Sequence, residues 1–388
     1  MVNQLPQGWK EEELGKHADI KRGSTITKKQ VVLGDYPVVA GGKEAAYYHN
    51  EYNRQPPVIT VSGSGASAGY VNYWEVPIFA SDCSTIEEKD LNIKYIYYFL
   101  KSRQQELLDK QVGVAIPHVS PKDIYPLLIP YPTDEDEQEY IVKTLDAVAE
   151  MIKLRKETIQ LTKDLIPAIF QEMFGDPITN PKGWEILSLY NIITQINNGY
   201  NPPKKDFGTG IPFVTVNNLY DGLSIDYDSL DKVVVSNKQI QKYKLNYGDI
   251  CFVRSSVKRE GIGQASAYLS NQDAIFGGFV IRVTPNETFN PIFLSEYFQT
   301  EAMRNIIINK SVTGVMTNIN QPALLSIPVL NVPFSMQEEF AKKVEQINKY
   351  IVAQQEELEH FETLFQSLLQ EAFTGVLTWK YPRKENND

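Results

Sequence analysis

The sequence has few of the residues that build metal and disulfide sites. Only 2 of its 388 residues are cysteine and 4 are histidine. Cys83 and Cys251 lie far apart, and neither has a second cysteine or a histidine at ligand spacing beside it. A disulfide framework, a zinc site and a catalytic metal centre are therefore not expected.

Long hydrophobic runs and an excess of positive charge are also absent. No window approaches the roughly 18 uninterrupted apolar residues of a membrane helix, and residues 1–10 lack the basic and apolar run of a signal peptide. We therefore expect a cytoplasmic protein with no membrane partner. The 38 Lys and Arg against 48 Asp and Glu give a net charge of −10. Taken alone, this charge argues against nucleic acid as a partner, because phosphates are contacted mainly by Lys and Arg.

The length exceeds that of one ordinary domain, and an internal repeat indicates how the chain divides. Gly8-Trp9 and Gly183-Trp184 open two similar segments 175 residues apart, each expected to be a short amphipathic stretch ending at a glycine turn. Residues 138–174 match residues 337–373 without a gap, at an offset of 199. The globular part of the second copy is thus 24 residues longer, whereas the segments that follow have equal length.

The two matched segments have the periodicity of long helices. Apolar residues recur at alternating spacings of three and four over more than four heptads, as in helices that pack along a seam. Pro167 is expected to kink the first helix or to end its regular hydrogen bonding. The predicted seam residues are Ile141, Leu145, Val148, Ile152, Ile159, Ile166, Ile169, Phe340, Val344, Ile347, Ile351, Leu358, Phe361, Phe365 and Leu368.

The apolar face widens in the last turns of both helices. Two coverings are equally consistent with the pattern, namely the chain's own globular parts and the helices of a partner. The residues that widen the face are Leu161, Leu165, Phe170, Phe174, Leu364, Leu369 and Phe373.

Each long helix follows a globular part with strands and one helix. The helices are expected at residues 91–110 and 292–309, and Pro-rich strands at 128–132 and 329–333 lead into the long helices. The order is therefore globular, helix, globular, helix. The other expected strands are 38–40, 58–61, 70–73, 76–80, 213–216, 233–235, 250–253, 265–269 and 279–283.

Three stretches resemble catalytic motifs only in part. Residues 63–68 fit a dinucleotide fingerprint, but strand composition follows where that site needs a helix. Residues 201–203 resemble the Asn-Pro-Pro-aromatic loop of amino-methyltransferases, but Lys204 replaces the aromatic residue on which a base would stack. Asp82 with Glu87 and Lys89 is too closely spaced for a nuclease cluster, and Glu87-Glu88-Lys89-Asp90 is typical of a solvated loop. We therefore expect no catalytic site.

Polar, glycine-rich and aromatic loops remain, and their chemistry is that of nucleic-acid recognition. Arg, Lys, Asn and Gln can contact base edges, whereas Ser, Thr and backbone amides can hold phosphates. The DNA-contact candidates of the first globular part are Lys21, Arg22, Thr25, Lys28, Lys29, Lys43, Tyr47, Ser62, Ser64 and Ser67. Those of the second are Tyr200, Lys204, Lys205, Asn217, Asn218, Arg254, Ser255, Ser256, Lys258, Arg259, Asn318, Asn320 and Gln321.

The chain resembles the DNA-specificity subunit of type I restriction-modification systems over nearly its whole length. The resemblance is carried by the Gly-Trp pairs at positions 8 and 183, by residues 119–138 and 319–337 before the helices, and by the helix ends at 165–177 and 364–375. One difference is that the usual Pro-Pro and Glu-Gln pairs are loosened here to Pro130-Tyr131-Pro132 with Glu137-Gln138, and to Pro333 with Met336-Gln337.

This resemblance implies an α+β fold with a pseudo-twofold internal repeat. Two target-recognition domains of mixed β-sheet and helices, at 1–132 and 181–334, would be separated by two long antiparallel coiled-coil helices at 133–180 and 335–378, with a polar tail at 379–388. Each domain would read one half of a bipartite site on double-stranded DNA. The chain would dock two modification subunits, which use S-adenosylmethionine, and restriction subunits, which use ATP, and would hold no cofactor of its own.

Two other classes of protein remain as alternatives. A coiled-coil adaptor whose globular parts bind protein or glycan would account for the helices, but it gives no reason for paired domains of unequal length. A stand-alone methyltransferase would rest on residues 201–203 alone.

The distribution of charge removes the objection to DNA. Residues 1–132 carry a net charge of −1 and residues 181–334 a net charge of +1, whereas residues 133–180 carry −6 and residues 335–388 carry −4. The acidic excess therefore lies on the predicted helices and their flanks. Because the domains are neutral in sum, we expect weak DNA binding by the chain alone, with partners supplying much of the positive charge.

Overall fold

The computed structural model describes residues 5–109, 118–220 and 224–377. The chain forms two compact units: unit 1 contains Met1–Lys156 and Glu356–Asp388, and unit 2 contains Glu157–Gln355. Each unit therefore combines one globular part with segments of both long helices. None of the helices in the described ranges is long and apolar enough to cross a membrane.

Unit 1 is built on two small β-sheets. An antiparallel four-stranded sheet has the order β2 (Ala18–Arg22), β8 (Cys83–Glu88), β5 (Val58–Ser62), β6 (Val71–Trp74). A three-stranded sheet has the order β4 (Tyr47–His49), β3 (Tyr36–Val39), β7 (Phe79–Ala80), with β3 antiparallel to β4 and parallel to β7. β1 (Trp9–Glu13) pairs with β9 (Leu128–Pro132), immediately before the long helix.

Helices close the core of unit 1. α2 (Ile93–Ser102) begins at Asn92, whose side chain accepts hydrogen bonds from the backbone N–H groups of Lys94 and Tyr95, so the sequence itself sets the helix start. Ile96 and Phe99 of α2 belong to the same core as Ile59 of β5. The short helices of this unit are α1 (Leu14–His17), α3 (Gln104–Asp109) and α4 (Pro121–Ile124).

Unit 2 repeats this plan. Its antiparallel four-stranded sheet has the order β11 (Ile193–Asn198), β18 (Val280–Pro285), β14 (Ile250–Val253), β16 (Ala265–Ala267). Its first three-stranded sheet has the order β13 (Asp231–Val233), β12 (Phe207–Val214), β17 (Ile275–Phe276), again with one antiparallel and one parallel pair. β10 (Glu185–Ser188) pairs with β21 (Pro328–Asn331) before the second long helix. The helices are α6 (Asn237–Tyr243), α7 (Pro291–Gln299), α8 (Glu301–Asn309) and α9 (Gln321–Leu325).

A further sheet distinguishes the longer unit. β15 (Ser255–Ser256), β20 (Thr317–Asn318) and β19 (Val312–Thr313) form three short antiparallel strands, whereas at the equivalent place in unit 1 the structure describes a single antiparallel bridge between Ser64 and His118.

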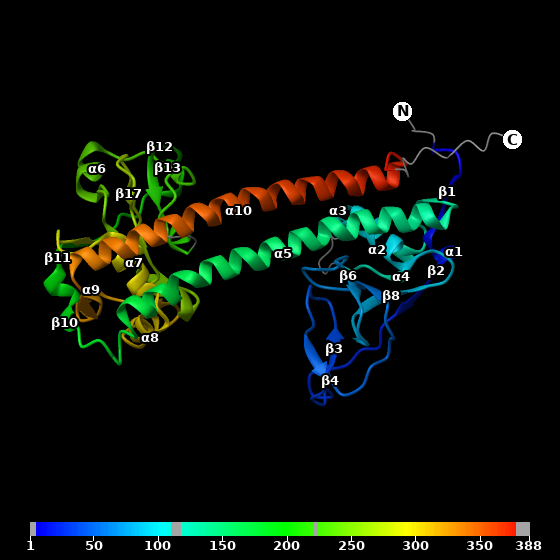
Figure 1. The fold of residues 1–388 in the computed structure, drawn as a ribbon, viewed down its shortest axis with the longest axis horizontal. Coiled ribbons are helices and arrows are strands. Elements are labelled where there is room, and N and C mark those ends of the chain that lie inside the picture. Colours follow the sequence, from blue (N-terminus) through cyan, green and yellow to red (C-terminus); the bar gives the residue numbers. More distant parts are fainter. Residues whose placement is uncertain (1–4, 110–117, 221–223, 378–388) are drawn as a thin grey trace. The chain divides into compact units, whose positions relative to one another are not determined.

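The two long helices are α5 (Glu135–Phe174) and α10 (Phe334–Thr374), drawn as uninterrupted ribbons in Figure 1. All fifteen predicted seam residues are buried or half-buried. In unit 1, Arg155 of α5 forms an ion pair of 2.5 Å with Glu357 of α10, and Ile141 shares a core with Phe373. The helices are therefore antiparallel in this unit. Unit 2 agrees, because Phe174 packs on Phe340 near the start of α10.

Several expected elements differ from the structure. α5 continues past Pro167 to Phe174, so the proline does not end the helix. The helices expected at 91–110 and 292–309 are each two helices, broken at Arg103 and Thr300. The segment from Trp9 to Gly23 holds two strands, and Glu87-Glu88 belongs to β8 and not to a loop. β1 and the end of β8 were missed because runs of charged residues, Lys10 to Glu13 and Glu87-Glu88, are not typical of strands.

The covering of the widened helix ends differs along each helix. Phe170 and Phe174 are buried in the core of unit 2, and Leu369 and Phe373 in the core of unit 1. The chain itself covers these residues. Those that remain exposed are Leu161, Leu165 and Leu364, with exposed fractions of 67%, 50% and 45%.

Candidate nucleic-acid interface

In unit 1 the candidate loops meet at the ends of β2, β3 and β5. Ser62 Oγ donates a hydrogen bond of 2.8 Å to the carbonyl of Gly42. A Cβ on Gly41 would lie 2.3 Å from the carbonyl oxygen of Ser64, so only glycine lets the loop after β3 approach the loop after β5 so closely. The loops after β3 and β5, which the sequence offered as separate candidate segments, therefore lie side by side.

Two of the candidates in this surface share one carboxylate. Ser64 Oγ hydrogen-bonds to the Asp82 side chain, and Arg22 Nη2 lies 3.5 Å from the same carboxylate. Asp82 therefore holds both side chains and offsets part of the Arg22 charge. Similarly, Lys21 lies 3.4 Å from Asp19 and 3.8 Å from Glu87.

Other lysines of unit 1 lie over the faces of aromatic rings. Lys28 Nζ lies 5.7 Å from the centre of the Tyr47 ring. Lys43 and Lys101 lie 5.3 and 4.9 Å from the centre of the Tyr70 ring, and neither forms an ion pair with the residues that the structure describes. Burial lowers the pKa of the Lys101 ammonium, and the nearby Lys43 charge lowers it further.

Sequence reasoning missed Lys101 because it occupies a helix and not a loop. Its spacing along α2 is that of an ordinary helix surface, and no local signal places it beside Tyr70 and Lys43. The remaining candidates of unit 1 do not join these contacts: Thr25 and Lys29 are exposed in the segment after β2, and Ser67 is half-buried between β5 and β6.

In unit 2 four candidates line one hollow of about 520 Å³. They are Asn217, Ser255, Ser256 and Lys258. Ser255 Oγ lies 2.5 Å from the side-chain oxygen of Asn318, a fifth candidate on the paired strand β20. Val257, from the same predicted loop as Ser255 and Ser256, also lines the hollow. The residues that sequence reasoning missed come from separate segments: Val216, Tyr220, Glu260, Gly261, Gln264, Phe279 and Met316.

Arg304 of α8 holds one wall of this hollow. Its Nη2 donates hydrogen bonds of 2.7 Å to the carbonyls of Glu260 and Ile262, while Nη1 has no partner among the residues that are described. Burial lowers the pKa of the Arg304 guanidinium to about 10. A buried guanidinium bonded to two carbonyls fixes the backbone of the segment on which Glu260 and Gly261 lie.

The other candidates of unit 2 lie outside the hollow. Tyr200 stacks on Tyr243 with ring centres 5.6 Å apart. Several have structural contacts: Asn218 accepts bonds from Thr215, Arg254 donates to the carbonyl of Gly278, Asn320 caps α9, and Gln321 bonds to Asn198. Lys204 and Lys205 lie in a 3₁₀ turn, and with Arg259 they are exposed.

The partial motifs have structural explanations. Residues 63–68 are followed by strand β6, so the helix that a dinucleotide site needs is not there. Asn201 accepts a hydrogen bond of 3.1 Å from the backbone N–H of Gly278, which accounts for the polar residue before the two prolines.

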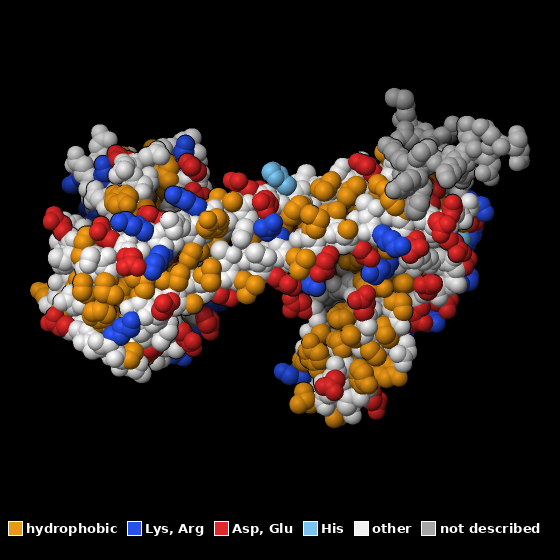
Figure 2. All heavy atoms as spheres, viewed as in Figure 1, with side chains coloured by type: hydrophobic (Ala, Val, Ile, Leu, Met, Phe, Trp, Pro, Cys, Tyr) orange, Lys and Arg blue, Asp and Glu red, His pale blue; other side chains and the backbone are white. Residues whose placement is uncertain are grey.

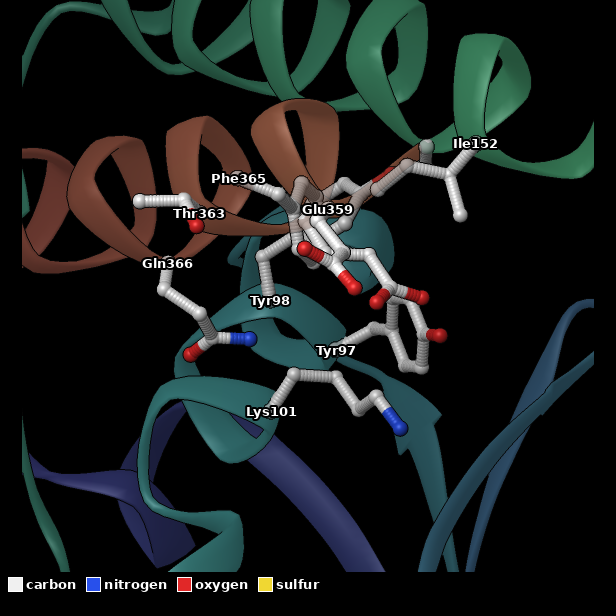
Figure 3. Close-up of a pocket in the computed structure, with 10 residues that line it drawn as sticks. Tyr97, Tyr98, Lys101, Ile152, Glu359, Thr363, Phe365 and Gln366 are labelled. Carbon is white, nitrogen blue, oxygen red and sulfur yellow. The ribbon is translucent and has the colours of Figure 1, made fainter. Parts of the chain in front are cut away.

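A second hollow, of about 750 Å³, lies in unit 1 beside the long helices. Figure 3 shows Tyr97, Tyr98 and Lys101 of α2 facing Glu359 and Phe365 of α10. Tyr98 donates a hydrogen bond of 2.5 Å to Asp146 of α5, and Lys94 forms an ion pair of 2.9 Å with the same carboxylate. These contacts fasten α2 to α5.

Comparisons with known proteins agree with this architecture. The family described as the type I restriction modification DNA specificity domain matches residues 6–163 and 181–362. The specificity subunit of the type I restriction enzyme EcoKI of Escherichia coli K12 is 23% identical, over 100% of this chain and 93% of that protein.

Two solved structures share the fold. The S subunit of a type I restriction-modification system from M. genitalium has a TM-score of 0.57 and 18% identity, over 95% of this chain and 98% of that one. A chain solved in work on complex assembly and conformational transition of the type I R-M system has a TM-score of 0.56 and 18% identity, over 96% and 100%.

The chain therefore belongs to the type I restriction-modification DNA specificity family, with one copy of the domain in each half of the sequence. It is a specificity subunit with two DNA-recognition domains.

Proposed function

We propose that the chain reads a bipartite DNA target, with one half-site for each recognition domain, and performs no catalysis itself. Methylation and cleavage would be carried out by modification and restriction subunits, which would bind S-adenosylmethionine and ATP. The complex would act in the cytoplasm, where DNA and both cofactors are present.

The observation that carries this proposal is that one sheet-and-helix plan occurs twice with different loops. The four-stranded sheets of the two units have equivalent strand orders, β2-β8-β5-β6 and β11-β18-β14-β16. The candidate contact residues differ between the units. In unit 1 they are mainly lysines that lie over aromatic rings, whereas in unit 2 amide and hydroxyl groups line a hollow. Equivalent frameworks with different contact residues are suited to reading two different half-sites.

The exposed leucines of the long helices support the docking of two equivalent partners. Leu165 and Leu364 occupy the same position of the repeat, and their exposed fractions are 50% and 45%. Figure 2 shows that hydrophobic side chains reach the surface along the long helices among charged ones. We assign these two leucines to the docking sites of two identical modification subunits, since equivalent positions in a repeat can bind equivalent partners.

The distribution of charge supports a division of labour in DNA binding. The two recognition domains are neutral in sum, and the helical segments are acidic. Phosphate contacts contribute much of protein–DNA affinity. The chain would thus contribute sequence reading, while its partners would contribute much of the attraction to phosphates.

Retention of DNA by the purified chain with and without its modification subunit tests this proposal. We expect weak retention of duplex DNA by the chain alone and strong, sequence-dependent retention after the modification subunit is added. A coiled-coil adaptor would retain no DNA under either condition. A stand-alone methyltransferase would instead bind S-adenosylmethionine without a partner, which equilibrium dialysis with the cofactor would detect.

A further inference from the structure

The hollow of unit 2 contains polar side chains without a hydrogen-bond partner in residues 5–109, 118–220 and 224–377. Asn217, Tyr220, Ser256 and Gln264 line it, and their side chains form no hydrogen bond with any residue in the described part of the chain. Side-chain amides can donate and accept at once, and a hydroxyl can do either. The hollow therefore offers a mixed set of donors and acceptors to a ligand that carries both.

The position of these groups determines what can reach them. Ser256 has an exposed fraction of only 8%, and Gly261 lies so close that a Cβ on it would be 2.6 Å from Ser256 Oγ and 2.8 Å from Tyr220 Oη. Ser256 Oγ is therefore recessed below the surface. A base pair that stays stacked in a duplex presents only its edge in a groove. Contact with Ser256 requires a chemical group that enters the hollow.

The apolar lining favours a flat ligand. Phe279 is a large aromatic side chain in the hollow with an exposed fraction of 52%, and Val257, on another segment, has an exposed fraction of 81%. Val216 and Met316 complete the apolar surface. An exposed aromatic ring beside amide groups suits an unstacked nucleobase, which combines a planar face with a polar edge.

The charges in the hollow argue against a phosphate as its ligand. Lys258 is its single cation among the lining residues, and Glu260 lies on the same short segment. This pair leaves no net positive charge. The volume of about 520 Å³ falls within the range of small-molecule sites, which are mostly apolar with a few convergent polar groups.

We propose that this hollow receives one nucleobase of the second half-site, displaced from the DNA stack. Gln264 and Asn217 read the polar edge of the base, and Phe279 supports its face. The proposal rests on the function proposed above, because the DNA must first be bound by the recognition domain. It adds a second form of sequence reading, because a base of the wrong shape or polarity would leave these groups unpaired.

Arg304 is the positioning residue of this site. It is not among the residues that line the hollow, but its two hydrogen bonds hold the carbonyls on either side of Gly261, which abuts Ser256 and Tyr220. Its effect on reading would therefore be indirect, through the backbone of this wall.

The proposal is tested by placing a mismatched base pair at each position of the second half-site in turn. The full chain in complex with its modification subunit is first used to map the target by methylation. A set of duplexes is then prepared, each with a mismatch opposite one base of the second half-site. The Kd of the complex for each duplex is measured. The methylated adenine is left out, because an enzyme that modifies a base also withdraws it from the stack.

We expect a mismatch at one position to tighten binding roughly tenfold, because a weakened pair reduces the cost of unstacking. The substitutions Gln264→Leu and Asn217→Leu should each remove this gain. Asn217 is exposed, so its substitution leaves the fold intact. Gln241→Leu, at an exposed position of α6, is the matched control and should keep the gain.

The proposal would be overturned if no mismatch at any position tightened binding. It would also be overturned if the mismatch still tightened binding in both the Gln264→Leu and the Asn217→Leu variants. In either case, specific binding to the mapped site would leave the proposed function standing. A complex that binds no duplex specifically would refute the proposed function and this inference together.

Discussion

The ring of Phe373, at the end of the last helix, lies 5.2 Å from the ring of Tyr95 on α2, edge to face at 69°. The second copy has the same relationship, since the ring of Phe174 at the end of α5 lies 5.1 Å from that of Phe293 on α7 at 75°. α5 therefore begins in unit 1 and ends in the core of unit 2, whereas α10 begins in unit 2 and ends in the core of unit 1. The first globular part is completed by the C-terminal helix, and the second by the helix that precedes it.

Removing either of these aromatic rings should destabilise mainly one unit. Phe373→Ala leaves a cavity among Tyr95 and Phe99, and we expect it to reduce the free energy of unfolding of unit 1 by about 3–5 kcal/mol. Phe174→Ala should have the same effect on unit 2. Scanning calorimetry would follow both units. Leu161→Ala, at an exposed position, is the control and should leave the unfolding profile unchanged. Equal destabilisation of both units by each substitution would contradict this exchange of helix ends.

The two thiols should be inert in the folded protein. Cys83 and Cys251 are buried, with exposed fractions of 1% and 0%. Burial raises the pKa of the Cys83 thiol to about 12, and it raises the pKa of the Cys251 thiol as well. Because the thiolate is the reactive form, a disulfide reagent at pH 8 should label neither residue until denaturant is added. Stoichiometric labelling of the native protein within minutes would show that one of the two cores is open.

Docking of the modification subunits should depend on the equivalent leucines of the repeat. Leu165→Glu alone and Leu364→Glu alone should each reduce the complex from two modification subunits to one, and the double variant should bind none, because a charge replaces an apolar contact. Native mass spectrometry would count the subunits. The control is the double variant Gln171→Glu with Gln370→Glu. These two glutamines are exposed, occupy equivalent positions of the repeat, and lie about a third of a turn around the helix from the leucines. Two bound subunits in the double leucine variant would exclude these positions from the docking sites.

The repeat and the long helices were predictable from the sequence because their signals are local and periodic. Spacings of three and four persist over each helix, and all the predicted seam residues are buried or half-buried. The matched segment of residues 138–174 also predicts that the helix passes Pro167, and the packing of Phe170 and Phe174 in the core of unit 2 holds the turns that follow the proline.

The candidate site was predictable only in part. Loop composition singled out Asn217, Ser255 and Lys258, which do line one hollow. Gln264, Phe279 and Met316 reach the same hollow from other segments, and nothing in their local sequence indicates this convergence. Strands of two residues, such as β15 and β20, are too short to have a periodic signal, although they carry the Ser255–Asn318 contact.

The length of the long helices should set the gap between the half-sites. Deleting seven residues from each, which preserves the seam register, would shorten both by about 10 Å at about 1.5 Å per residue. We expect the spacer of the DNA target to lose about three base pairs at about 3.4 Å each. Methylation mapping reports the spacer directly. A deletion variant that still assembles and methylates with the original spacer would contradict the idea that the helices act as a ruler.

Methylation mapping of a chimera tests the central claim most directly. Residues 1–132 are replaced by the first recognition domain of another family member, and the chimera is assembled with the modification subunit. The account predicts that the sequence of one half-site changes, while the other half-site and the spacer stay as they were. A change in both half-sites, or in neither, would contradict the assignment of one half-site to each domain.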